Sequence, residues 1–327
     1  MTQEESKARA PQGHAYTGSK KADQHANPER GDITPEFARR CLLAAAASFL
    51  VFLAAGFAFH DRNYLSDGFF VRKYQHREKS DIVFVGDSRV IRGVDPSKVE
   101  ESIPGARSYN FGFSGLGIDL DVLNHAKRLI DPISRYKVIA VAVSRPSLSA
   151  ENAENNGYLE VEEMTSVERA NLAALGKYEG LFKMRPPRII PIRPDDSGFV
   201  FTGTVKASEA VARRDENNAD DRRTWVSDAQ VAKLAEWIAS STAQGYRIVV
   251  FRVPTSQRMY EIETGKLGLN LPSLRTKLES AGAAWIETPP YRRDLASYDG
   301  SHLTGKAAQA FTLELARKLR ETIGAQP

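Results

Sequence analysis

The stretch Asp81-Ile82-Val83-Phe84-Val85-Gly86-Asp87-Ser88-Arg89 opens the folded part of the chain. Its first half is a run of mostly β-branched residues that ends at Gly86, which predicts a buried strand. Ser88 follows that strand directly. A side chain in this position emerges at the carboxyl end of a sheet, where open α/β sheets form their ligand crevices. Ser88 is therefore the first candidate functional residue.

Further along the chain, apolar runs alternate with stretches of helical spacing. The continuous apolar character of the runs is typical of strands buried on both faces, and the alternation predicts a parallel sheet between two layers of helices. We therefore expect a three-layer α/β fold. The predicted strands are Tyr109-Asn110-Phe111, Val138 to Val143, Arg247 to Phe251 and Ala284-Trp285-Ile286, and the predicted helices are residues 118–130, 228–242, 271–282 and 305–323.

Residues 145–225 interrupt this rhythm and form a predicted insertion. It contains an acidic, helical stretch, a loop rich in proline and arginine, a predicted hairpin and a charged run. An insertion of this length is typical of a lid or of a surface that binds a partner, and the alternative is a solvent-exposed surface segment. The four parts are residues 160–181, 184–194, 199–205 and 212–223.

The N-terminal region has two parts. Residues 1–38 are polar and lack apolar periodicity, so we expect a disordered tail. Residues 41–59 carry no charge, and as a helix they would extend about 28 Å, close to the thickness of a bilayer core. We assign residues 39–60 to one transmembrane helix in preference to a cleaved signal peptide, 61–80 to a connector, and 81–324 to the α/β domain.

The charges beside the span predict its orientation. Arg39 and Arg40 stand at its N-terminal edge, whereas Asp61, Arg62 and Asp67 nearly cancel on the other side. The positive-inside rule then leaves the tail in the cytoplasm and the α/β domain in the periplasm or outside the cell. The protein is thus expected in the inner (plasma) membrane.

Composition excludes several classes of function. The net charge of +4 is small for 327 residues, and no dense basic stripe is interleaved with aromatics, so nucleic acid is not an expected partner. Cys41 is the single cysteine, which excludes an internal disulfide and a multi-cysteine zinc site. We predict no metal and no cofactor.

A serine hydroxyl is a weak nucleophile and needs an adjacent base. Of the six histidines in the sequence, only His125 and His302 fall in the α/β domain. His125 belongs to a predicted amphipathic helix, where a structural role is expected. Asp299 precedes His302 by three positions, so its carboxylate can bind one ring nitrogen and leave the other to accept the proton of Ser88.

Three segments resemble the SGNH/GDSL hydrolase superfamily: Gly86-Asp87-Ser88, Asn110 to Gly115, and Asp299 to Thr304. They stand in the order of its nucleophile block, glycine block and final Asp-His block, and the resemblance covers roughly residues 80 to 320. It implies a flavodoxin-like SGNH fold. It also implies Ser88 as nucleophile and oxyanion donor, His302 as base, Asp299 as its orienting partner, and Gly115, or Gly112, as the second oxyanion amide.

One block departs from that family. Its usual asparagine donor after the third strand is absent, and the chain reads Val143-Ser144-Arg145. Either Ser144 or Arg145 substitutes for it, or the site is slower or specialised. Membrane-anchored SGNH-like proteins of polysaccharide acetylation and teichoic acid D-alanylation, which this chain resembles, also vary this block.

The resemblance favours an extracytoplasmic O-acyl (acetyl) esterase or acyltransferase that acts on a cell-surface polysaccharide through an acyl-serine intermediate. One alternative is a non-catalytic scaffold that partners an integral-membrane O-acyltransferase. Another is a lipid esterase or thioesterase at the membrane face. The expected partners are a glycan or acyl-ester substrate and the membrane.

Overall fold

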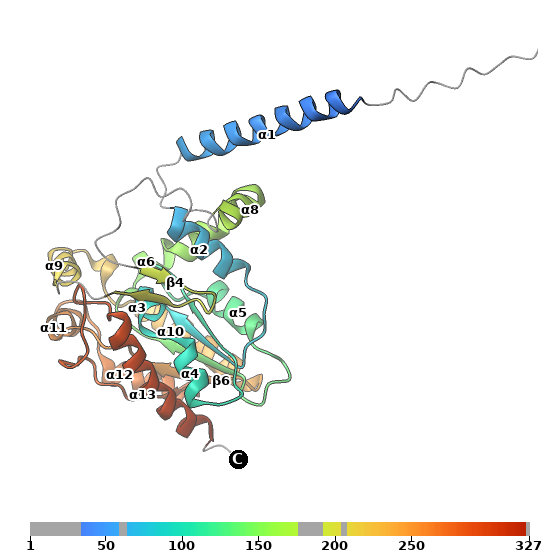
Figure 1. Ribbon diagram of the computed structural model, residues 1–327. Coiled ribbons are helices and arrows are strands. Elements are labelled where there is room, and N and C mark those ends of the chain that lie inside the picture. The colour runs from blue at the N-terminus through green and yellow to red at the C-terminus, as the bar shows by residue number, and fades with distance from the viewer. Residues whose placement is uncertain (1–33, 59–63, 176–191, 204–207, 325–327) are drawn as a thin grey trace, which may run out of the picture. The chain divides into compact units, whose positions relative to one another are not determined.

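The computed structural model describes residues 34–58, 64–175, 192–203 and 208–324 (Figure 1). The chain divides into two compact units, Met1–Asp61 and Arg62–Pro327. In the first unit, helix α1 (Pro35–Ala58) covers most of the predicted membrane span. No helix in the described ranges is both long and apolar enough to cross a membrane. The anchor stays a prediction, and residues 1–33 of the predicted tail lie outside the described residues.

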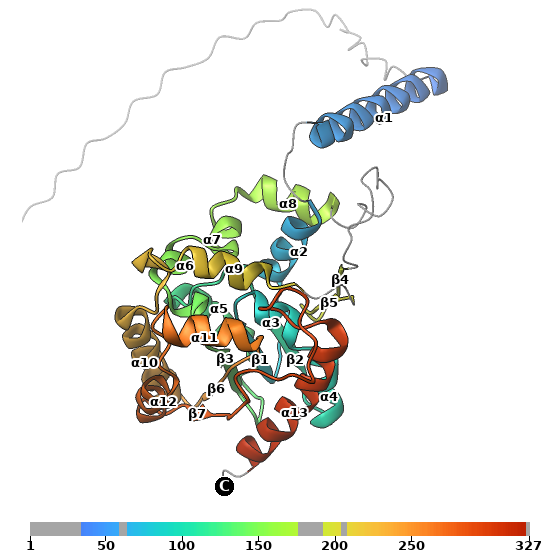
Figure 2. The same ribbon diagram turned by 90° about the vertical axis from the view of Figure 1, so that its left-hand side faces the viewer.

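The second unit is built on a five-stranded sheet in which every pairing is parallel. The strand order is β2-β1-β3-β6-β7, and Figure 2 shows the strands in this order across the view. The predicted parallel sheet is confirmed. The strands are β1 (Ile82–Gly86), β2 (Ser108–Gly112), β3 (Val138–Ala142), β6 (Arg247–Phe251) and β7 (Ala284–Trp285).

Alternate residues of the strands face two separate hydrophobic cores. Val83 and Val85 of β1 belong to the core with helices α5, α10 and α12, whereas Ile82 and Phe84 belong to the core with α3, α4 and α13. The three-layer arrangement follows from this alternation, since side chains of a strand point to opposite faces in turn. These helices are α3 (Ser88–Gly93), α4 (Pro96–Ser102), α5 (Leu120–Leu129), α10 (Asp228–Ala243), α12 (Leu271–Ser280) and α13 (Gly305–Gly324).

Part of the predicted connector is a helix of the second unit. Helix α2 (Tyr64–Gln75) follows the first unit, and its Phe69 and Val71 are buried. Val71 packs with Val161, Met164 and Leu172 of the insertion. These apolar contacts explain why the segment folds onto the unit.

The insertion differs from its predicted outline. Strand β5 (Val200–Thr202) pairs antiparallel with β4 (Ile192–Pro194), so the hairpin begins in the predicted loop and not at residue 199. Gly198 explains the turn, because its φ of +84° favours glycine. Residues 176–191 of the predicted helix and loop lie outside the described residues. The remaining elements are η1 (Pro146–Leu148), α6 (Ala150–Glu154), α7 (Gly157–Glu162), α8 (Ser166–Leu175), α9 (Ala210–Asn217), η3 (Arg222–Thr224) and α11 (Gln257–Gly265).

Candidate active site

Ser88 is the first residue of α3, directly after strand β1. Asp87 caps the helix, since its Oδ1 accepts a hydrogen bond from the amide of Arg89 at 2.8 Å. Gly86 makes the sharp turn possible: a Cβ there would lie 2.5 Å from Cγ2 of Val90. The partly buried hydroxyl of Ser88 is thus fixed at the carboxyl end of the sheet.

The Asp299–His302 loop presents the base. Oδ1 of Asp299 accepts hydrogen bonds from the amides of Ser301 and His302, both at 2.9 Å. Its Oδ2 lies 2.7 Å from Nδ1 of the His302 ring. Gly300 has a φ of +90°, which lets the chain turn tightly enough for these bonds. The loop therefore orients the imidazole through its own backbone.

The predicted nucleophile and the predicted base meet in the structure. Ser88 Oγ lies 2.7 Å from His302 Nε2, although the two residues are 214 positions apart. An ionised Asp299 accepts the proton on Nδ1, which leaves Nε2 as the acceptor for the serine hydroxyl. The structure therefore brings Ser88, His302 and Asp299 into the hydrogen-bonded order of a nucleophile-base-orienter triad.

The ionisation states suit this order. Burial opposes the charge of Asp299, but the hydrogen bond and charge of His302 and two backbone amides outweigh it and lower the pKa of Asp299 to about 2. Burial lowers the pKa of His302 below its ordinary value, although Asp299 acts in the opposite direction. The carboxylate is thus charged and the imidazole neutral at neutral pH, as a general base requires.

In the glycine block, the amide of Gly115 is a candidate oxyanion donor. Gly115 has a φ of +59°, and its carbonyl accepts a hydrogen bond from Nδ2 of Asn152 at 2.7 Å. Among the described residues, neither its amide nor that of Ser88 has a hydrogen-bond acceptor. The amide of Gly112 instead donates to Oδ1 of Asn110 at 3.1 Å. Of the two glycines expected as oxyanion donors, only Gly115 has its amide available.

Ser144 and Arg145, which were expected to replace the missing asparagine, form hydrogen bonds with other residues of the protein. Ser144 Oγ donates to Oδ2 of Asp87 at 2.7 Å, and its amide donates to Ser147 Oγ at 2.8 Å. The buried guanidinium of Arg145 pairs with Asp215 in α9. The arginine therefore ties α9 to the end of β3, and both side chains are bonded to carboxylates.

Two residues that were not predicted as site residues, Arg89 and Tyr298, support the triad. Nε of Arg89 donates to Oγ of Ser301 at 2.9 Å, and its Nη2 lies 2.7 Å from Glu263, which also pairs with Arg252. The ring of Tyr298 stacks on that of His302, with centroids 5.6 Å apart. Arg89 directly follows the Gly86-Asp87-Ser88 motif and Tyr298 directly precedes Asp299, and this proximity is the signal that the sequence offers for them.

The insertion reaches the loop of the base. The amide of Val211 in α9 donates to the carbonyl of Asp299 at 3.2 Å, and that of Ser208 to Tyr298 at 3.0 Å. A part of the insertion thus contacts the loop that carries Asp299 and His302. His125 lies elsewhere: it is a buried residue of α5 whose ring contacts the hydroxyl of Tyr158, where a structural role fits it.

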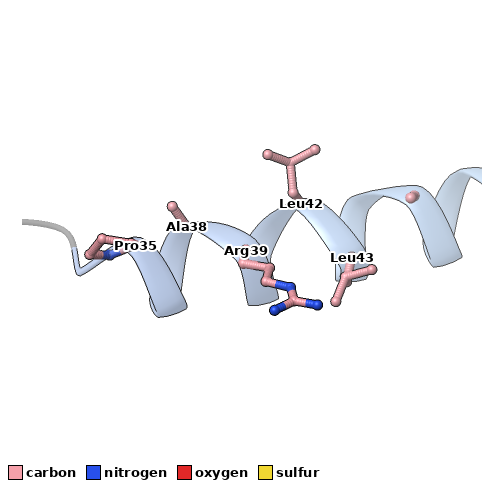
Figure 3. A pocket seen from close by; sticks show the side chains of 6 residues that line it. Pro35, Ala38, Arg39, Leu42 and Leu43 are labelled. Carbon is pink, nitrogen blue, oxygen red and sulfur yellow. The ribbon is translucent and has the colours of Figure 1, made fainter.

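A hollow of about 610 Å³ lies along α1 in the first unit, and Pro35, Ala38, Arg39, Leu42 and Leu43 line it (Figure 3). It contains no triad residue. Within the described ranges, no group of three or more His, Cys, Asp or Glu side chains is arranged to hold a metal ion.

No family model matches the chain, and no curated protein matches it. Among solved structures, a carbohydrate acetylesterase family member from Sinorhizobium meliloti aligns with a TM-score of 0.32 at 11% identity, over 74% of this chain and 99% of that one. An aryl esterase from M. smegmatis aligns with a TM-score of 0.30 at 11% identity, over 73% and 98%. Similarity at this level carries no argument about this chain.

Proposed function

We propose that the protein is a serine O-acyl esterase or O-acyltransferase that works through an acyl-serine intermediate. The observation that carries the proposal is the continuous contact from Ser88 Oγ to His302 Nε2 and from His302 Nδ1 to Asp299, each at 2.7 Å. A hydroxyl at hydrogen-bond distance from a neutral, oriented imidazole is the arrangement that activates a serine.

In the first half-reaction, Ser88 Oγ attacks the carbonyl carbon of an acyl ester while His302 Nε2 takes the hydroxyl proton. The negative oxygen of the tetrahedral intermediate accepts hydrogen bonds from the amides of Ser88 and Gly115. When the intermediate collapses, the bond to the leaving alcohol breaks and His302 gives its proton to that alcohol. Asp299 stabilises the imidazolium in between.

In the second half-reaction, an acceptor hydroxyl attacks the acyl-serine. His302 removes the acceptor's proton, and Ser88 leaves with that proton restored. Water as acceptor completes hydrolysis, whereas a sugar hydroxyl completes acyl transfer. The triad is the same in both reactions, so the choice depends on what occupies the acceptor side of the site.

For the biological setting we propose an acetylated or otherwise acylated cell-surface polysaccharide as substrate. The uncharged run 41–59 and the Arg39-Arg40 flank support a single-pass anchor with the α/β domain outside the cytoplasm. An anchored enzyme favours a polymer held at the same surface. An integral-membrane O-acyltransferase is the proposed partner for the transfer reaction.

A non-catalytic scaffold is the second candidate, and a specific observation favours it. Ser144 and Arg145 are bonded to Asp87 and Asp215, so the site has two proposed oxyanion donors and not three. A lost donor costs about 3 kcal/mol of transition-state stabilisation in a working site. A scaffold would tolerate this loss, whereas an esterase would be slowed by it.

A labelling experiment on the full-length protein in detergent separates the two. A fluorophosphonate probe should add covalently to the wild-type protein at Ser88, and p-nitrophenyl acetate should be cleaved at a rate that Ser88→Ala abolishes. Ser147→Ala is a control, because that buried serine contacts Ser144 and not His302. Absence of both labelling and cleavage in a folded wild-type protein would reject the enzyme and leave the scaffold.

A further inference from the structure

Lys73 of α2 is buried beneath the glycine block. Its side chain is 1% exposed. Nζ donates to the carbonyls of Gly112 at 2.8 Å and Gly198 at 2.7 Å, and lies 3.5 Å from Oδ1 of Asn110. The rings of Phe69 and Phe113 flank it, with centroids 4.8 and 5.8 Å away.

A lysine in this position is costly. Burial lowers the pKa of Lys73 well below its ordinary value, and the charge of Asp195 opposes this only in part. Removing an ammonium group from water is unfavourable unless hydrogen bonds replace its hydration. Here two backbone carbonyls and a side-chain amide oxygen replace it. The buried lysine therefore requires these three oxygens to stay in place around Nζ.

The Gly112 carbonyl connects Lys73 to both proposed oxyanion donors. It belongs to the Gly112–Phe113 peptide group, whose N–H donates to the carbonyl of Gly86 at 3.0 Å. Gly86 ends β1 two residues before Ser88, and Gly112 ends β2 three residues before Gly115. The Gly112–Phe113 peptide group thus accepts a hydrogen bond from Lys73 on its oxygen and donates one to Gly86 from its nitrogen. It joins the segment that carries Ser88 to the segment that carries Gly115.

The second backbone carbonyl, that of Gly198, extends this junction to the insertion. Gly198 lies in the β4–β5 turn, and a Cβ there would lie 2.1 Å from the carbonyl oxygen of Asn110. The neighbouring Ser197 accepts a hydrogen bond from the amide of Asn110 at 2.9 Å. Lys73 therefore ties α2, the end of β2 and the insertion's hairpin at one point.

We infer that Lys73 is a positioning residue of the oxyanion hole: it fixes the Gly112–Gly115 segment against the end of β1, so that the amides of Gly115 and Ser88 converge on one oxygen. The inference rests on the proposed function. It adds that α2, the first helix after the proposed anchor in the sequence, helps to set the catalytic geometry.

Lys73→Met in the full-length protein tests this, because methionine keeps much of the length and none of the donors. We expect kcat for p-nitrophenyl acetate to fall by roughly 10- to 100-fold, as displacement of a catalytic group by about 1 Å can do. KM should change by less than about twofold. Hydrogen exchange of peptides covering residues 112–118 should become faster. Lys73→Gln, which keeps one donor group, should lower kcat less than Lys73→Met does.

Two controls separate positioning from mere stability. Phe69→Leu trims the same buried pocket without removing a hydrogen bond, and should lower Tm while leaving kcat nearly unchanged. Lys277→Met removes an exposed lysine of α12 and should change neither. The inference is overturned if Lys73→Met keeps the wild-type kcat. It is also overturned if Phe69→Leu and Lys73→Met lower Tm equally and lower kcat equally.

The same experiment distinguishes failure of the proposed function. If the wild-type protein and Ser88→Ala are equally inactive, the enzyme assignment fails, whereas hydrogen exchange still reports whether Lys73 orders the 112–118 segment. Unchanged exchange in both Lys73 variants would reject the positioning role by itself.

Discussion

Arg89 and Ser301 join the two halves of the candidate site. Nε of Arg89, the residue after the proposed nucleophile, donates to Oγ of Ser301, the residue before the proposed base, at 2.9 Å. The bond spans 212 positions of sequence, and both residues are buried. The distance between Ser88 and His302 thus depends on a second contact that involves neither side chain.

Glu263 holds this contact in place, and its removal should be costly. Burial opposes ionisation, but Arg89 and Arg252 outweigh it and lower the pKa of Glu263 to about 2. Glu263→Gln leaves two buried guanidiniums without their counter-charge, so we expect a loss of about 3 kcal/mol or more in the free energy of unfolding. Urea denaturation followed by circular dichroism measures it. Glu261→Gln, on the exposed side of α11, is the control, and an equal loss there would contradict the role of Glu263.

The triad residues should contribute unequally. His302→Ala removes the base and is expected to lower kcat by roughly 10⁶-fold, whereas Asp299→Asn should lower it by roughly 10⁴-fold, because the base remains but its orientation and charge stabilisation are lost. Steady-state kinetics on p-nitrophenyl acetate measures both. The reverse order, or no effect of His302→Ala in a folded protein, would exclude His302 as the base.

How much of this could be predicted depends on how local each signal is. Ser88, Asp299 and His302 were accessible because a strand end and an i, i+3 pair are local patterns. Glu263 was not, because it lies 174 positions from Arg89 in a helix that reads as ordinary surface sequence. The pairing of Arg145 with Asp215 could not be predicted either, since Asp215 is one of many charged residues in its stretch of sequence.

The pH profile should follow His302. The active form has a neutral imidazole, so kcat/KM falls as pH drops through the pKa of His302. Burial lowers this pKa below 6.5, and Asp299 raises it. The midpoint of the acid limb is therefore expected below pH 6.5, and it should move to still lower pH in Asp299→Asn, measured on the residual activity. A limb centred above 6.5 in the wild-type protein would contradict the assignment.

The proposed topology predicts the behaviour of reporter fusions. Residues 41–59 are uncharged, Arg39 and Arg40 flank the N-terminal edge, and the charges on the other side nearly cancel. Alkaline phosphatase fused after residue 327 should therefore be active in a bacterial host. A cytosolic reporter such as β-galactosidase at the same position should be inactive. Arg39→Glu combined with Arg40→Glu should weaken this contrast. An active cytosolic reporter on the wild-type sequence would exclude the proposed orientation.

Gly115 provides the sharpest test of the oxyanion hole. Its φ is +59°, and a Cβ would lie 3.3 Å from Nδ2 of Asn152, so Gly115→Ala should displace the segment and its free amide. We expect kcat to fall by roughly 10- to 100-fold with KM changed by less than about twofold, because this hydrogen bond strengthens only in the transition state. Gly105→Ala is the matched control: its φ is +81° and nothing lies within 4 Å of the added Cβ, so it introduces a similar backbone strain of about 1 kcal/mol away from the site. An unchanged kcat in Gly115→Ala would remove that amide from the oxyanion hole and leave Ser88 as its sole proposed donor, which would favour the scaffold.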